Sequence, residues 1–323
     1  MAYNKQNYIR LSEEFRQGYR VAEQAADDRR QEIHMIIPEI ASLDRLLATT
    51  SSQIMAAAMQ NAGKDDARSA IEEIRARNLE INARRRKLLK EHGYPEDYTE
   101  PRYRCSACGD TGFIGTSICT CLKAALVEAG YESAGIKAIK DKLTFDSFSL
   151  DYYRENPEHH QRMSQILNAA KKYAEDFRSG ADNLLLMGGT GLGKTHLSVA
   201  IAKTVVERGY DVLYACAIDM ISDFEAQRFG GSSARNDTSA YYNCELLVID
   251  DLGTEMSNQF TATVLYNLIN ARLNSGLATV ISTNLTPNEL RTRYWDRITS
   301  RIFGEYRILP FLGKDVRMQK MSK

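Results

Sequence analysis

The feature that most constrains this chain is a run of eight residues, Gly188-Gly189-Thr190-Gly191-Leu192-Gly193-Lys194-Thr195. A short apolar stretch, residues 184–187, precedes it, and a helical pattern follows it. The glycines allow successive backbone N–H groups to turn onto phosphate oxygens, and the next helix directs its positive end at the same anion. The context of strand, loop and helix therefore predicts a phosphate-binding loop (P-loop), rather than a glycine-rich turn with a chance lysine.

Three side chains at the end of this loop are expected to contact the ligand or its metal. Lys194 would reach the β- and γ-phosphates of a nucleotide, and Thr195 would offer its hydroxyl to magnesium. His196 follows at the start of the predicted helix. We expect ATP or ADP with Mg²⁺ as the cofactors, and all of 188–196 as cofactor-binding residues.

A second apolar run, residues 246–249, ends in Asp250 and Asp251. Asp250 is the expected magnesium partner through water. Asp251 would orient or deprotonate the attacking water, because phosphoryl transfer depends mainly on positioning and charge stabilisation. The alternative is that Asp251 begins a turn with Gly253. Asn284 follows a further predicted strand, at the end where ligands sit in open α/β sheets, although an asparagine there can also be a turn residue.

From residue 143 onward, brief apolar runs alternate with longer helical patterns. This alternation predicts an α/β domain, a parallel sheet flanked by helices, over 143–323. The expected strands are 184–187, 212–215, 246–249 and 279–282. Near the C-terminus, Arg297 and Arg301 lie four apart on one helical face, and Arg317 follows. In isolation these are surface charges, but an arginine from a neighbouring subunit can stabilise a transferring phosphate.

Residues 1–98 contain almost no strand signal and are expected to form an α-helical N-terminal domain. Apolar residues recur at helical spacing at Ile33, Ile36, Ile37, Ile40, Leu43 and Leu47, and at seven-residue intervals at Ile74, Ile81 and Leu88. Pro38 is expected to kink or divide the first helix, and Gly93 and Pro95 to end the last. The pattern favours a helical hairpin or small bundle that serves either partner binding or oligomerisation.

Four cysteines crowd into the segment 99–125, as Cys105-x-x-Cys108 and Cys119-x-Cys121. Two short thiolate pairs suit tetrahedral zinc, and such a segment is too small to bury a core of its own. His92 is a candidate substitute ligand because the second pair is spaced by one residue. A redox pair or reduced spectator thiols are the alternatives, and the Cys-x-x-Cys is not set in a βαβ pattern as redox pairs are.

The residues beside these cysteines leave two interpretations open. Arg102, Tyr103, Arg104 and Phe113 could stack on and pair with single-stranded DNA, or could simply pack a small zinc knuckle. After the knuckle, residues 126–142 are expected to form a linker helix.

The charge balance excludes binding driven by net attraction to nucleic acid or membrane, because 42 basic residues match 42 acidic ones. We find neither a long apolar run nor the apolar core of a secretory signal at the N-terminus. We therefore expect a cytoplasmic protein without a membrane partner.

The residues 188–195, LLVIDDLGTE at 246–255, VISTN at 280–284 and DRITSRIFGEYRIL at 296–309 together resemble the AAA+ domain of bacterial helicase loaders of the DnaC and DnaI type. LTFDSFSLDYY at 143–153 looks like the entry to that domain. The resemblance covers 143–323. It implies that Asn284 is the sensor-1 residue, that Arg301 is the arginine finger with Arg297 close by, and that Arg317 is the sensor-2 arginine.

The resemblance also implies a function. Such a protein binds the hexameric DnaB-type replicative helicase through its N-terminal region and uses ATP to place the helicase on single-stranded DNA in replication initiation. It is expected to form homo-oligomers when bound to ATP or helicase. Many AAA+ ATPases have glutamate where this chain has Asp251, so we expect ATP hydrolysis that is slow or stimulated by a partner or DNA.

Two other functions fit the same nucleotide site. One is a transposition helper ATPase that resembles IstB-type proteins, although the cysteine segment and the long helical N-terminus argue against it. The other is a small-molecule kinase, which would need an acceptor pocket and a lid for which the sequence has no signal.

Overall fold

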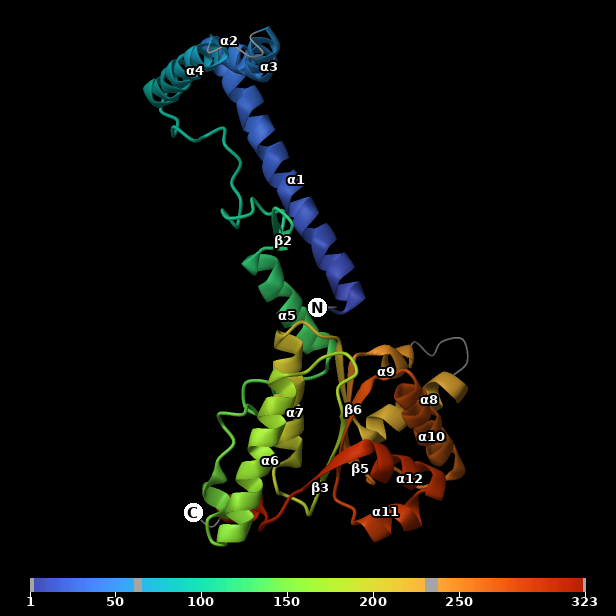
Figure 1. The fold of residues 1–323 in the computed structure, drawn as a ribbon. Helices are drawn as coiled ribbons and strands as arrows, with labels where there is room; N and C mark the ends of the chain where they lie inside the picture. Colours follow the sequence, from blue (N-terminus) through green and yellow to red (C-terminus); the bar gives the residue numbers. More distant parts are fainter. Residues whose placement is uncertain (1–2, 61–65, 230–237, 322–323) are drawn as a thin grey trace. The chain divides into compact units, whose positions relative to one another are not determined.

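The computed structural model describes residues 3–60, 66–229 and 238–321. The chain forms two compact units (Figure 1). The first, which we call the nucleotide unit, comprises Met1–Leu11 and Lys123–Lys323, and the second, the helical unit, comprises Ser12–Leu122. Most of the predicted helical region and most of the cysteine segment thus lie in one unit. The functions that we expect for 1–98, 99–125, 126–142 and 143–323 stay predictions.

The helical unit contains most of α1 (Lys5–Ile36) and all of α2 (Pro38–Ala48), α3 (Thr50–Gln60) and α4 (Asp66–Glu91). Pro38 stands at the first position of α2, so it divides the first two helices as predicted. The small core joins Ile33, Ile37 and Ile40 to Leu88 and Leu89, all fully or nearly fully buried. The helical bundle predicted from the apolar spacing is confirmed.

The cysteine segment follows α4 and contains a two-stranded antiparallel hairpin, β1 (Phe113–Ile114) and β2 (Ser117–Ile118). The next helix, α5, runs from Thr120 to Ser133. The linker helix predicted over 126–142 is therefore wrong beyond Ser133. Gly135 adopts φ 75°, and the N–H of Ile136 turns back to the carbonyl of Tyr131, which is a helix-ending arrangement that glycine favours.

The nucleotide unit is built on five parallel strands in the order β4-β5-β6-β3-β7. They are β3 (Asn183–Met187), β4 (Val212–Cys216), β5 (Leu246–Leu252), β6 (Ala278–Thr283) and β7 (Tyr306–Pro310). The first four match the predicted strands. The edge strand β7 was not predicted.

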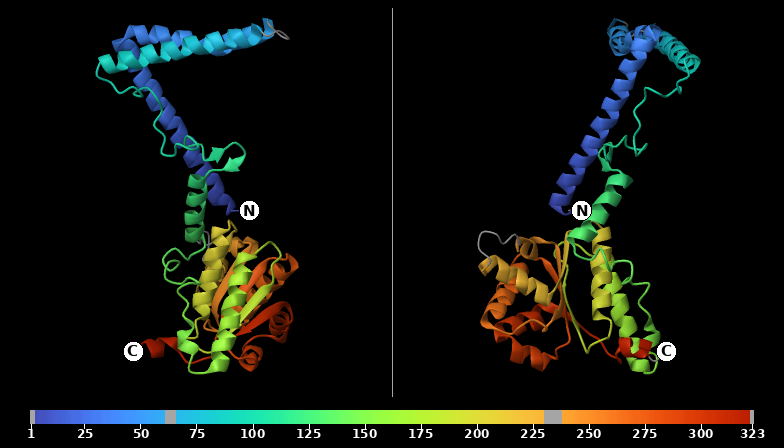
Figure 2. Two further views of the ribbon diagram at one scale, coloured as in Figure 1. Left: turned by 60° about the vertical axis from the view of Figure 1, so that its left-hand side comes forward. Right: turned by 180° about the vertical axis from the view of Figure 1, so that it is seen from behind.

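Helices cover both faces of this sheet (Figure 2). On one face α6 (Pro157–Glu175) and α7 (Lys194–Glu207) pack on Leu184 and Leu186, and on the other α8 (Ala217–Phe229), α10 (Gln259–Asn274) and α12 (Asp296–Glu305) pack around Leu185. The alternation follows from the two-residue period of a strand. The remaining elements are short: η1 (Leu150–Tyr153), α9 (Ser239–Asn243), α11 (Pro287–Arg293) and α13 (Val316–Met321). The predicted α/β fold, a parallel sheet flanked by helices, is confirmed.

Within residues 3–60, 66–229 and 238–321, none of the helices combines the length and apolar character that a bilayer crossing requires.

Candidate functional site

The P-loop connects β3 to α7, as the sequence predicted. Gly191 and Gly193 adopt φ 74° and 84°, a backbone region that favours glycine. A Cβ at Gly193 would lie 2.7 Å from the ring of Phe148, and one at Gly191 would overlap the carboxylate of Asp315. The loop is held from outside as well, because the hydroxyl of Tyr153 donates to the carbonyl of Leu192 at 2.9 Å. These positions accept only glycine, and the backbone approaches its neighbours too closely for a side chain.

Lys194 begins α7 with its side chain folded back over the loop. Its ammonium donates to the carbonyls of Gly188 and Gly189 at 2.7 and 2.6 Å and to Oδ1 of Asn284 at 2.6 Å. Burial lowers the pKa of Lys194, against the opposing effect of Asp251 and Asp250. A phosphate placed in this loop would offer the ammonium further acceptors, and the P-loop lysine and Asn284 lie together as the sequence predicted.

The two predicted magnesium ligands also lie together. Thr195 donates through its hydroxyl to Oδ2 of Asp250 at 3.0 Å. Oδ2 of Asp250 accepts a second hydrogen bond from Tyr214 at 2.6 Å, and Oδ1 accepts one from Ser282 at 2.6 Å. Hydroxyl and carboxylate oxygens are the ligands that Mg²⁺ prefers, so this donor set fits the ion. Burial and the charge of Asp250 raise the pKa of Tyr214, which keeps its hydroxyl a donor.

Asp251 occupies an unusual backbone conformation for a residue other than glycine, with φ 54°. It lies at an irregularity of the β5–β6 pairing between Ile249 and Leu252, which turns its side chain towards the P-loop pocket. The amide of Asn284 lies 3.5 Å from Oδ1 of Asp251. Burial, followed by the nearby charge of Asp250, raises the pKa of Asp251. A carboxylate with a raised pKa beside a phosphate site has the properties of a water-orienting base.

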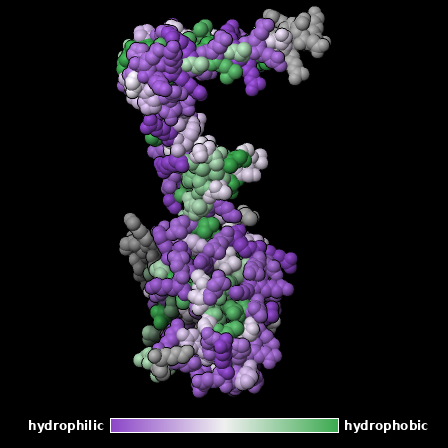
Figure 3. All heavy atoms as spheres, turned by 90° about the vertical axis from the view of Figure 1, so that its left-hand side faces the viewer, coloured by the Kyte–Doolittle hydropathy of each residue, from purple (hydrophilic) through white to green (hydrophobic). Residues whose placement is uncertain are grey.

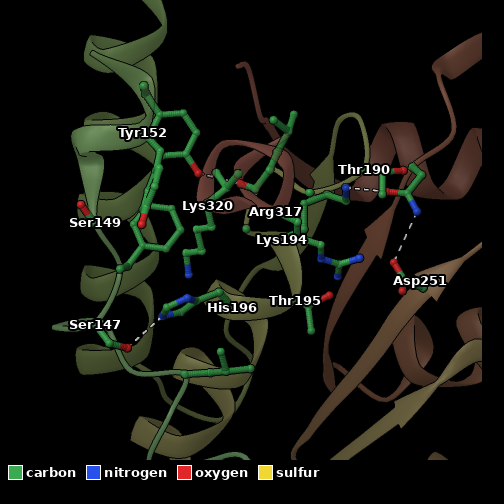
Figure 4. A pocket seen from close by; sticks show the side chains of 18 residues that line it. Ser147, Ser149, Tyr152, Thr190, Lys194, Thr195, His196, Asp251, Arg317 and Lys320 are labelled. Atoms are coloured by element: carbon green, nitrogen blue, oxygen red, sulfur yellow. Dashed lines mark hydrogen bonds between the residues drawn. The ribbon is translucent and has the colours of Figure 1, made fainter. Parts of the chain in front are cut away.

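A cavity of about 260 Å³ opens over the P-loop (Figure 4). Its lining includes the predicted residues Thr190, Lys194, Thr195, His196, Asp251, Asn284 and Arg317. His196 is held by the carbonyl of Thr144 at 2.7 Å and by Ser147 at 3.2 Å, and burial lowers its pKa. The cavity thus brings together residues from opposite ends of the α/β region.

Sequence reasoning missed several residues of this site. Phe148, Tyr152, Tyr153 and Lys320 line the cavity, while Tyr214 and Ser282 contact Asp250. Figure 4 shows Lys320 and Arg317 reaching into the pocket from α13. The stretch LTFDSFSLDYY held the only sequence signal for any of them, because it was recognised as the entry to the domain.

The other two arginines lie outside the described lining of this cavity. Arg301, on α12, donates to Oδ1 of Asn270 at 3.0 Å, and its guanidinium lies 4.9 Å from the ring centre of Tyr266. Arg297 lies one turn earlier, where its carbonyl accepts a hydrogen bond from Arg301. Neither residue contacts the nucleotide site of its own chain in the part that the structure describes.

The four cysteines meet in one cluster within the helical unit. The Sγ atoms of Cys105, Cys108, Cys119 and Cys121 all lie within 4.8 Å of one another. Four sulfurs at about 2.3 Å from a common zinc ion would be spaced by about 3.8 Å, and the Cys105–Cys119 and Cys108–Cys121 pairs are 3.9 and 3.5 Å apart. The backbone N–H of Cys121 lowers the pKa of the Cys119 thiol to about 7. The group can therefore hold a metal ion.

Hydrogen bonds within the knuckle shape this cluster. Asp110 is buried, and its backbone adopts φ 58°. Its carboxylate accepts hydrogen bonds from the N–H groups of Arg104 and Cys105 at 2.9 and 2.7 Å. His92 is not among the described residues of the cluster and instead hydrogen-bonds the carbonyl of Leu88 at 2.8 Å. Its candidacy as a substitute ligand was wrong, because the end of α4 directs its ring back along the helix.

The aromatic residue beside the cysteines packs against the helical unit. Tyr103 stacks on Tyr19 of α1 at 6.0 Å between ring centres and donates to Glu23. This contact favours the packing interpretation for Tyr103, whereas Arg102 and Arg104 are exposed.

Comparison with known proteins gives one family and two groups of relatives. Residues 135–321 match the model of the family described as IstB-like ATP binding protein. The replicative helicase loader DnaC of Buchnera aphidicola subsp. Schizaphis graminum is 23% identical over 172 residues, which are 52% of this chain and 66% of that protein. DnaC of Escherichia coli strain K12 is 23% identical over 181 residues, 56% of this chain and 71% of that protein. The chain thus spans just under two thirds of the length of the Buchnera relative.

The solved structures that match this chain include a DnaC helicase loader and DnaI. The DnaC structure has a TM-score of 0.47 with 22% identity, covering 54% of this chain and 99% of that one. The DnaI structure has a TM-score of 0.44 with 19% identity, covering 55% and 91%. The expected resemblance to DnaC-type loaders is confirmed by the sequence relatives. Since the family model matches more than half of its length, the chain belongs to the IstB-like ATP-binding protein family.

Proposed function

We propose that this protein is an ATP-dependent loader of a DnaB-type replicative helicase. The observation that carries the proposal is the pairing of an assembled nucleotide site with relatives named replicative helicase loaders. Those relatives match about half of this chain at 23% identity, and the family match covers residues 135–321. The function proposed for the helical unit therefore rests on its own surface. ATP would act as a switch, since such a protein needs a difference in partner affinity between its nucleotide states.

The nucleotide site supports ATP hydrolysis through named side chains. Lys194 would bind the terminal phosphates, and Thr195 with Asp250 would hold Mg²⁺, which neutralises charge on the phosphates when bound. Asp251, aided by Asn284, would orient the attacking water. The carboxylate of Asp251 is one methylene shorter than glutamate, which supports slow turnover that a partner or DNA stimulates.

The helical unit supports partner binding because it exposes apolar side chains on charged helices. Met35, Leu46, Met55 and Leu79 are 78%, 54%, 64% and 66% exposed. Figure 3 shows patches of hydrophobic residues (green) among hydrophilic ones on this unit. Amphipathic helices with exposed apolar residues commonly dock into grooves of partner proteins.

We assign helicase binding to 1–98, a zinc-stabilised knuckle to 99–125, a linker to 126–142 and the ATPase to 143–323, in a cytoplasmic protein.

A reconstituted loading assay tests this function. The full-length chain would be mixed with the purified replicative helicase of the same organism and circular single-stranded DNA. We expect a complex in size-exclusion chromatography and ATP-dependent transfer of the helicase to the DNA, which Lys194→Ala should abolish without preventing folding. A full-length chain that neither binds the helicase nor increases its amount on DNA would contradict the proposal.

A second candidate is a transposition helper, and the description of the matching family favours it. The same binding assay distinguishes the two functions. A complex with a transposase encoded near this chain, together with none with the helicase, would establish the helper function instead.

A further inference from the structure

Four hydroxyl groups surround the carboxylate of Asp250, which is only 5% exposed. Oδ2 accepts from Thr195 at 3.0 Å and from Tyr214 at 2.6 Å. Oδ1 accepts from Ser282 at 2.6 Å, with Ser198 at 3.5 Å. An ionised carboxylate has no proton to donate, so Thr195, Tyr214 and Ser282 must be the donors. The hydroxyl of Ser198 instead donates at shorter range to the carbonyl of Thr195, 3.0 Å away. Both oxygens of Asp250 are thereby fixed in direction.

The register of the sheet explains why a tyrosine reaches Asp250 from β4. Cys216 is paired with Asp250 across the parallel strands, and Tyr214 is paired with Val248. Tyr214 therefore lies on the same face as Asp250 and diagonal to it, a distance that an aromatic side chain spans and a serine does not. The hydroxyl is the only polar group of the Tyr214 side chain, and it donates to Oδ2 of Asp250.

Ser282 reaches the other oxygen from β6, on the opposite side of β5. The pairing between β5 and β6 is irregular between Ile249 and Leu252, which removes the N–H of Asp251 from the regular ladder. The oxygen of Ser282 accepts that N–H at 2.9 Å, while its proton goes to Asp250. The hydroxyl of Ser282, which is inaccessible to solvent, thus holds both the side chain of Asp250 and the backbone of Asp251 in place.

We propose that Tyr214 and Ser282 are positioning residues that hold the carboxylate of Asp250 in the orientation required for magnesium-nucleotide binding. The proposal rests on the magnesium site of the proposed function and on no assumption about the partner protein. Thr195 and Tyr214 share Oδ2, so this oxygen faces the threonine that would coordinate the ion. Groups that orient a metal ligand without touching the metal commonly change metal affinity by about 10- to 100-fold when removed. Asp250 is expected to act through water, so the lower end of that range applies here.

Tyr214→Phe tests the proposal because it removes one hydroxyl and leaves the ring. Tyr241→Phe is a matched control, because Tyr214 and Tyr241 each donate to a carboxylate oxygen at 2.6 Å. The acceptor of Tyr241 is Oδ2 of Asp223, which lies outside the described lining of the P-loop cavity. The affinity of the full-length chain for a fluorescent ADP analogue would be measured in EDTA and across a magnesium titration. We expect Tyr214→Phe to need about tenfold more Mg²⁺ than wild type, with unchanged affinity in EDTA. Tyr241→Phe should match wild type in both conditions.

Ser282→Ala provides a second variant should Tyr214→Phe fail to fold, which circular dichroism would reveal. It should raise the Mg²⁺ requirement in the same way. A normal or lower Mg²⁺ requirement in the folded variants overturns the positioning role and leaves the loader function intact. An equal loss of affinity in EDTA also overturns it, because it would show a general structural effect. If wild type itself shows no Mg²⁺-dependent nucleotide binding, both this inference and the proposed ATPase function are wrong.

Discussion

Asp251 combines three properties that rarely coincide by chance in a structural residue. It has a left-handed backbone, it is partly buried beside Asp250, and its pKa is raised by that environment. Strained conformations cost roughly 1–3 kcal/mol each and persist where the surrounding structure enforces them. The hydrogen bond from the Asp251 N–H to Ser282 supplies part of that enforcement.

The raised pKa of Asp251 gives a pH prediction for ATP hydrolysis. A base works only above its pKa, so lowering the pH should protonate Asp251 and reduce the single-turnover rate at a higher pH than an aspartate at its ordinary value of 3.8 would allow. Asp251→Asn should bind nucleotide normally and hydrolyse it about 100-fold more slowly above the pKa of Asp251, and the difference should shrink as the pH falls below that pKa. A variant with wild-type rates would exclude Asp251 as the base.

The sequence located the P-loop and both aspartates because these residues belong to contiguous motifs with a strand on one side. Tyr214 and Ser282 carry no such signal. They act on Asp250 only because β4 and β6 flank β5 in the sheet, and strand order is not written in local sequence. Lys320 was missed for a related reason, since α13 must fold back over the P-loop before its side chain faces the cavity.

Among the elements of the nucleotide unit, α10 is linked to the end of α9 and to β6 by hydrogen bonds from the buried side chain of Arg272. Arg272 is 1% exposed and donates to the carbonyls of Tyr241, Cys244 and Ala278 and to the hydroxyl of Thr279. Arg272→Met would leave those buried acceptors without donors. We expect a loss of roughly 3 kcal/mol in the free energy of unfolding, measured by urea denaturation.

The control for Arg272 is Arg178→Met, because Arg178 is exposed. That variant should change the free energy of unfolding by less than about 0.5 kcal/mol. Equal effects of the two substitutions would mean that the hydrogen bonds of Arg272 do not stabilise the packing of α10.

The cysteine knuckle gives a prediction about metal content. The purified full-length chain should contain about one zinc ion per molecule by atomic absorption, and Cys108→Ser should lose it because three thiolates remain. Cys216→Ser, which changes a cysteine of β4 outside the cluster, should keep it. A zinc-free wild type that folds normally when purified without chelator would favour reduced spectator thiols.

The sequence missed the strand β7 and misplaced the end of α5, for two different local reasons. β7 begins at Tyr306, directly after α12 ends at Glu305, so no turn residue separates the two elements. The strand contains Arg307 and ends in Pro310, and its edge position in the sheet permits both. The end of α5 was misplaced although Gly135 marked it, because apolar residues continue at helical spacing to Ile139.

On the scale of the whole molecule, the position of Arg301 predicts catalysis between chains. Arg301 lies outside the described lining of its own nucleotide cavity, where Asn270 and Tyr266 hold it on α12. An Arg301 that stabilises a transferring phosphate would therefore have to act on a neighbouring copy in a head-to-tail assembly. Arg301→Ala and Lys194→Ala proteins should each be inactive as ATPases. Random mixing would pair an intact P-loop with an intact arginine at about a quarter of the interfaces, which should restore a comparable fraction of wild-type activity.

Arg178→Ala mixed with Lys194→Ala provides the matched control, in which activity should only reflect the share of intact P-loops. A mixture of Arg301→Ala and Lys194→Ala no more active than either protein alone would show that Arg301 does not act on a neighbouring site.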